Sequence, residues 1–190
     1  MADRLYVSCW IPGFNAMSMP KLYEKALRLF PFSKLRRTNS VFRIYALEYV
    51  EPPLLEVPLA IPVDVDDIVA SATEFQSIDA CYELETAWDL WSWDGDWKLA
   101  PTSVLISCFG PEFSHDTDEH LRVEFGLEEQ FLPGAAGPGG LKMLRANIQS
   151  LLRLVHDFDD RLKLERRQLW SESGQNLGPR LESALRQYQE

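Results

Sequence analysis

The sequence predicts an α+β protein in which helices cover one face of an antiparallel sheet. Several segments alternate apolar and polar residues with the period of two that marks a half-buried strand. Other segments carry apolar stripes at helical spacing. In chain order the elements run β-α-β-β-α-β and then add two strands, so we expect a ferredoxin-like arrangement extended by two antiparallel strands, with a long C-terminal helix packed on the domain.

The first four elements end at recognisable breaks. A strand is expected over residues 4–11, and Ser18 can cap the helix that follows it. Two strands are then expected at 41–50 and 54–61. Because Pro58 lacks the N–H group that a strand interior donates to its neighbour, we expect the second of these strands at a sheet edge.

A second helix and three strands complete the expected sheet domain. Asp64 has the character of an N-cap for the helix. The strands are expected at 81–91, 103–109 and 120–127. Since the last of them alternates cleanly between apolar and charged residues, it predicts a sheet with one face in water.

Glycine and proline mark one internal boundary. Residues 133–140 form a Gly/Pro-rich connector between a sheet domain at 1–132 and a helical segment at 141–190 that packs on the same domain. Apolar residues then recur at steps of three and four from Leu141 to Leu162. This seam either packs on the chain's own sheet and helices or forms a homodimer through the 141–162 helix.

The composition of the chain limits the classes of partner that we expect it to bind. The formal net charge of −10 repels nucleic-acid phosphates, so we expect no nucleic-acid partner, although an aromatic sheet face admits single-stranded nucleic acid in principle. The three cysteines are far apart and suit free thiols, and we see no secretory signal and no membrane-spanning run. We therefore expect an acidic, cytoplasmic protein without membrane contact. The glycine-rich connector lacks a phosphate-binding signature, and no cofactor is expected.

The tryptophans supply the candidate binding surface. Four of the six lie between Trp88 and Trp97. Strand alternation places Trp88 in the core and directs Trp91 and Trp93 to the opposite face. The same argument places other aromatic and charged side chains on that face, which makes it a candidate contact surface. Its candidate residues are Trp10, Glu85, Asp89, Trp91, Trp93 and Arg122. The alternative is that the helix after Gly140 covers these rings in a second core layer.

The leading functional expectation is a non-enzymatic binding or regulatory protein that engages a protein or a small molecule through this aromatic, acidic sheet face. No nucleophile elbow or metalloprotease pattern is present, so we name no catalytic residue and no metal site. The alternative is an enzyme of unknown type. It would use acid/base or metal-ligand groups in the 115–120 loop, which are His115, Asp116, Asp118 and His120.

Overall fold

The computed structural model describes residues 3–132 and 139–187. Within them, seven strands form a single sheet, four helices pack on or beside it, and one short 3-10 turn follows the sixth strand. The strands are β1 (Arg4–Trp10), β2 (Ser40–Ala46), β3 (Leu55–Leu59), β4 (Ala80–Trp93), β5 (Trp97–Phe109), β6 (Leu121–Leu127) and β7 (Arg166–Ser171). The helical elements are α1 (Met19–Leu29), α2 (Val65–Glu74), η1 (Glu128–Gln130), α3 (Leu141–Leu162) and α4 (Gly178–Gln187).

The sheet order is β3-β2-β4-β5-β6-β1-β7, and all neighbouring strands are antiparallel. The ferredoxin-like expectation is therefore wrong, because a sheet of seven strands does not fit that small fold. The expected succession of elements does occur, but β1 pairs with β6 and β7, and two strands separate it from β4. Element order along a chain leaves strand pairing open.

Single residues explain where two helices begin and why one strand lies at the sheet edge. The side chain of Asp64 accepts a hydrogen bond from the backbone N–H of Asp66 at 2.9 Å, which confirms the predicted cap of α2. Pro20 lies in the first turn of α1, where its missing N–H costs little. Pro58 lies in β3, which is an edge strand as predicted.

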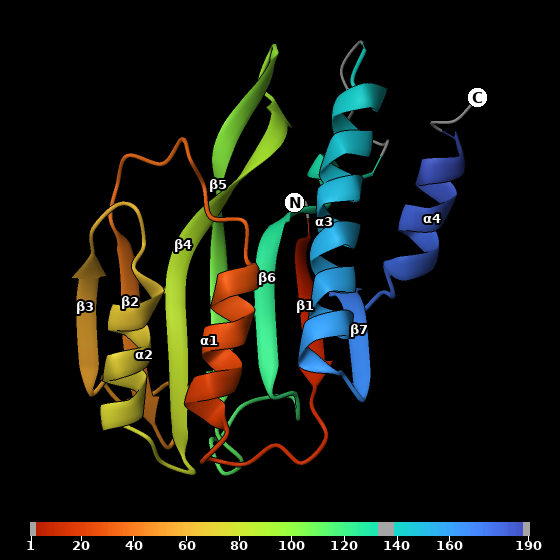
Figure 1. Cartoon of the computed structure of the whole chain (residues 1–190). Coiled ribbons are helices and arrows are strands. Elements are labelled where there is room, and N and C mark those ends of the chain that lie inside the picture. The colour runs from red at the N-terminus through yellow and green to blue at the C-terminus, as the bar shows by residue number, and fades with distance from the viewer. Residues whose placement is uncertain (1–2, 133–138, 188–190) are drawn as a thin grey trace.

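The core lies between the sheet and the helices. In Figure 1, α1, α2 and α3 all lie in front of the sheet, on one of its faces. Ile148, Leu151, Val155 and Phe158 of α3 are buried in the same apolar cluster as Trp88 of β4. These buried residues of the α3 seam therefore pack within the chain itself.

Two strands depart most from expectation. β5 begins at Trp97, six residues before the expected start, and β7 (Arg166–Ser171) was not expected. β7 is an outer strand whose first three residues are exposed and polar, so it lacks the alternation that reveals a half-buried strand. The C-terminal segment therefore contributes a strand as well as helices. Most of the expected connector, residues 133–138, lies outside the described residues.

No helix in the described part of the chain has both the length and the apolar composition that crossing a membrane requires.

Candidate binding site

Five of the six tryptophans lie on the sheet face opposite the helices. Residues that pair across neighbouring strands point to the same face of a sheet, and a series of such pairs crosses five strands here. Tyr6 of β1 pairs with Trp170 and with Glu124. Glu124 pairs in turn with Leu105, and Leu105 with Glu85. Side chains that alternate in step with these residues share their face. The indoles on this open face are Trp10, Trp91, Trp93, Trp97 and Trp170. None of the five packs against the apolar cluster that receives the α3 seam, so the expected alternative of a helix covering Trp10, Trp91 and Trp93 does not occur.

A fork in the sheet creates a hollow beside these indoles. β4 and β5 pair along their whole length, from Cys81↔Phe109 to Trp93↔Trp97. β5 and β6, in contrast, pair only between Val104↔Phe125 and Cys108↔Leu121. The outer half of the β4–β5 hairpin therefore extends past β6, as Figure 1 shows, and leaves a space between the hairpin and η1.

Gln130 of η1 bridges the fork. Its side-chain Nε2 donates to Ser92 Oγ at 3.0 Å and to Thr102 Oγ1 at 3.1 Å. Its Oε1 accepts from the backbone N–H of Leu127 at 2.9 Å. One buried amide thus replaces the strand pairing that β5 and β6 lack at this point, and it fixes the distance between the two walls of the hollow.

Asn147 of α3 holds the hairpin from the other side. Its Oδ1 accepts from Trp91 N at 2.9 Å, and its Nδ2 donates to Trp91 O at 2.8 Å, as a neighbouring strand would. Nδ2 also donates to Gln130 O at 2.8 Å. Because Asn147 is buried, these three hydrogen bonds tie α3, β4 and η1 into one polar network.

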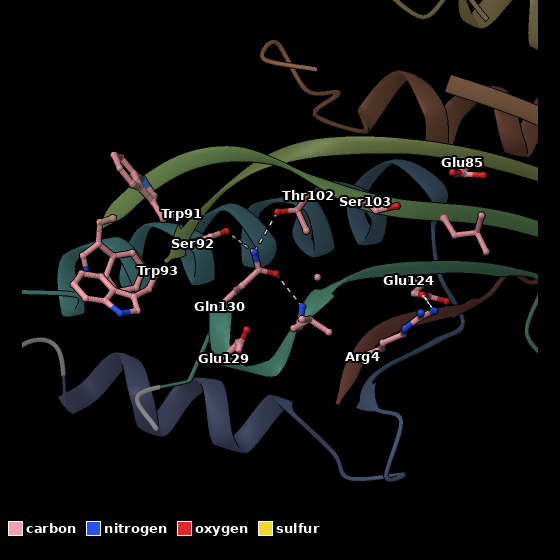
Figure 2. Close-up of a pocket in the computed structure, with 14 residues that line it drawn as sticks. Arg4, Glu85, Trp91, Ser92, Trp93, Thr102, Ser103, Glu124, Glu129 and Gln130 are labelled. Carbon is pink, nitrogen blue, oxygen red and sulfur yellow. Dashed lines mark hydrogen bonds and ion pairs between the residues drawn. The ribbon is translucent and has the colours of Figure 1, made fainter. Parts of the chain in front are cut away.

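The hollow has a volume of about 620 Å³, within the range typical of small-molecule sites. Figure 2 shows Trp91 and Trp93 at one end, Gln130 in the middle, and Arg4, Glu85 and Glu124 at the other end. We call this space the fork cavity. The residues that line it are Arg4, Glu85, Trp91, Ser92, Trp93, Trp97, Thr102, Ser103, Leu105, Glu124, Gly126, Leu127, Glu129 and Gln130.

The aromatic end of the fork cavity is built by the hairpin turn. Trp93 and Trp97 pair across β4 and β5, and their ring centroids lie 5.7 Å apart with an interplanar angle of 55°. Gly95 between them has φ of 73°, a conformation that glycine adopts readily and that suits a tight hairpin turn. These two inclined indoles, which we call the aromatic V, line this end of the cavity, and Trp93 is 40% exposed.

The other end of the fork cavity is charged. Arg4 donates to Glu124 at 2.7 Å, and Glu85 accepts from Arg43 of β2 at 3.0 Å, so both carboxylates are held in place. Glu129 adds a third carboxylate and is exposed. The lining contains three carboxylates against one guanidinium, that of Arg4, and the potential there favours a positively charged occupant.

Two predicted site residues instead hold loops. Asp89 accepts hydrogen bonds from Ser33 Oγ at 2.5 Å and from the backbone N–H of Lys34 at 2.9 Å. Arg122 is paired with Glu119 through an ion pair and donates to Thr117. Neither lines the fork cavity. Of the six candidates, the structure brings together Glu85, Trp91 and Trp93.

Trp10 lies in a separate, shallower hollow of about 470 Å³ on the same face. The guanidinium of Arg166 lies 3.6 Å from the centroid of the Trp10 ring, and Trp10 Nε1 donates to Asp118 at 3.1 Å. Beside it, Tyr6 and Trp170 stack with centroids 4.3 Å apart. This hollow thus already contains a cation against an indole, supplied by the chain itself.

The histidines of the 115–120 loop take part in separate packing contacts. His115 stacks on Phe109 with centroids 4.1 Å apart. His120 stacks on Phe14 at 4.3 Å, and its Nδ1 accepts from the backbone N–H of Ile11 at 2.9 Å. Among the described residues, no group of three or more His, Cys, Asp or Glu side chains could hold a metal ion.

The environment of His120 predicts a pH effect on stability. Burial lowers the pKa of His120 below its ordinary value of 6.5, and nearby carboxylates, Asp118 first, offset part of this shift. The neutral ring is therefore the form that favours the fold, and its contribution is lost as the pH falls below 6.5. We expect His120→Gln to lose less of its unfolding free energy than the wild type between pH 7 and pH 5, measured by urea denaturation. Parallel losses in the two proteins would show that His120 does not contribute.

Sequence reasoning missed several residues of this site. Trp97 was not named as a candidate, although the tight-turn signal at Asp94-Gly95 predicts a hairpin that sets it opposite Trp93. Arg4 and Glu124 meet only because β1 pairs with β6, a contact between distant parts of the chain. Gln130 carries no local signal of its role.

Comparison with known proteins finds no match to a protein-family model, to a curated protein or to a solved structure. The fold and the site therefore define this protein by its architecture, an α+β protein with a seven-stranded antiparallel sheet that carries helices on one face and indoles on the other.

Proposed function

We propose that this chain is a non-enzymatic binding protein that holds another molecule in the fork cavity. The observation that carries the proposal is the placement of Trp91, Trp93 and Trp97 around a cavity on the helix-free face. Burying apolar surface stabilises a fold by about 25 cal/mol per Å², and indole surface left in contact with water does not contribute this stabilisation. Tryptophan is also one of the residue types enriched at binding hot spots.

The rigidity of the walls supports this proposal. Gln130 and Asn147 fix the hairpin relative to η1 and α3 through buried hydrogen bonds. A cavity that is formed before the ligand arrives avoids part of the ordering cost of binding. The enzyme alternative lacks comparable support, because His115 and His120 are engaged in separate contacts and Asp116 and Asp118 are exposed.

Site-specific photo-crosslinking tests the proposal. A benzophenone amino acid at Ser103, an exposed residue of the cavity wall, is expected to crosslink a discrete species in cells that express the protein. The same group at Ile78, which is 48% exposed and precedes β4 at the strand end away from the hairpin turn, serves as the control. Adding Trp93→Ala to the Ser103 variant should abolish the crosslink.

The Ser103 crosslink is then identified by mass spectrometry. A product that is specific to Ser103 and lost with Trp93→Ala supports binding in the fork cavity. Identical products from Ser103 and Ile78, or none from either position, would contradict it.

We also propose a cytoplasmic location. Cys9, Cys81 and Cys108 are all buried free thiols, and this state is typical of proteins kept in a reducing compartment.

A further inference from the structure

We infer that the fork cavity binds a small molecule through an alkylated ammonium head group. This inference rests on the proposed function and specifies the chemistry of the ligand. It combines three features of the same cavity: an aromatic V, an excess of carboxylates and a volume suited to a small ligand.

The aromatic V supplies the kind of surface that a cation prefers. The faces of indole rings carry negative electrostatic potential, and tryptophan is the best partner for a cation placed over its ring. Trp93 and Trp97 both line the fork cavity and are inclined to each other by 55°, so a cation held at this end lies against indole surface. Quaternary ammonium groups are commonly recognised by such aromatic walls because they are large, charged and weakly hydrated.

The charges of the cavity support a cation rather than an anion. Glu85, Glu124 and Glu129 line it; Glu124 is paired with Arg4 and Glu85 with Arg43 of β2, so the exposed Glu129 is the carboxylate that carries the excess negative charge. The chain as a whole carries a formal net charge of −10, which attracts cations over longer distances.

The second hollow on the same face shows the same chemistry in use. There the Arg166 guanidinium lies 3.6 Å from the Trp10 ring centroid and 3.8 Å from Asp118. An indole and a carboxylate therefore hold a cation together. Among the described residues, no side-chain cation lies over Trp91, Trp93 or Trp97, so the equivalent position in the fork cavity is open to a ligand.

Choline and its uncharged carbon isostere, 3,3-dimethyl-1-butanol, form a matched pair of probes. We expect choline to quench the tryptophan fluorescence of the full chain saturably at constant ionic strength. The alcohol should bind about tenfold more weakly, because it fills the same volume without the cation–π attraction.

Three variants locate this binding. Trp93→Ala and Glu129→Gln should each weaken choline binding, the first by about tenfold and the second by about threefold. Trp170→Phe removes an indole of the same face outside the fork cavity and keeps a ring against Tyr6, so it should leave choline binding unchanged.

Two outcomes would overturn the inference. Equal binding of choline and the alcohol, with both lost in Trp93→Ala, would contradict cation recognition while leaving the fork cavity as a binding site. Absence of binding by either probe would also contradict the ammonium assignment, and the Ser103 crosslink would then decide separately whether the cavity binds another molecule.

Discussion

Replacing Trp88 by alanine is expected to lower the free energy of unfolding by about 3–5 kcal/mol. Trp88 is 1% exposed and packs between Phe30 and Phe125, with ring centroids at 5.9 and 6.1 Å. Removing its indole leaves a cavity that the surrounding side chains can fill only in part. Urea denaturation followed by circular dichroism measures the loss without relying on tryptophan fluorescence.

Trp93→Ala is the matched control, since it removes the same side chain from the same strand. Trp93 is 40% exposed and contacts the tilted ring of Trp97, so its loss should cost less than about 1.5 kcal/mol. A cost equal to that of Trp88→Ala would mean that both rings are core residues. The open indole face would then not exist.

Replacing Asn147 by alanine is expected to lower the free energy of unfolding by about 3 kcal/mol, because buried polar groups without a partner each cost about 1–3 kcal/mol. The change leaves Trp91 N, Trp91 O and Gln130 O without their partner. The edge of β4 should also open locally, which amide hydrogen exchange at Trp91 will detect as faster exchange.

Two further variants separate this network from general effects on α3. Gln149→Ala changes an exposed residue of the same helix and should alter stability by less than about 0.5 kcal/mol. Asn147→Asp keeps the acceptor for Trp91 N but loses both donated hydrogen bonds, so it should also be destabilising. A loss below about 1 kcal/mol in Asn147→Ala would show that the hairpin is held mainly by packing.

Local chemistry made most of the elements predictable. The cap at Asp64 and the edge position of Pro58 both follow from hydrogen-bonding capacity within a few residues. Strand pairing does not follow from such local signals, because β1 pairs with β6, which lies more than 100 residues later in the chain. A linear order that resembles a ferredoxin-like fold therefore folded into a different sheet.

The residues of the site show the same contrast between local signals, which the sequence contains, and long-range contacts, which it does not reveal. Alternation along one regular strand correctly placed Glu85, Trp91 and Trp93 on the face opposite Trp88. It also placed Asp89 there, but the loop after α1 uses that carboxylate for its own backbone and hydroxyl groups. Contacts between loops and strands depend on the folded path of the chain, and alternation contains no information about them.

Buried amides were the least predictable part. Asn147 interrupts the apolar side of α3, and a polar residue in such a position indicates a specific partner. The sequence contains no indication that this partner is the backbone of Trp91, since the two residues are 56 positions apart.

The central claim is that Trp91, Trp93 and Trp97 contact a bound molecule while Trp88 does not. Indole N–H resonances of the ¹⁵N-labelled protein, assigned by single Trp→Phe substitutions, test it directly during a choline titration. We expect saturable shifts for the three cavity indoles and unchanged signals for Trp88 and Trp170. Shifts that are equal at all six indoles, or confined to residues outside the cavity, would contradict the account.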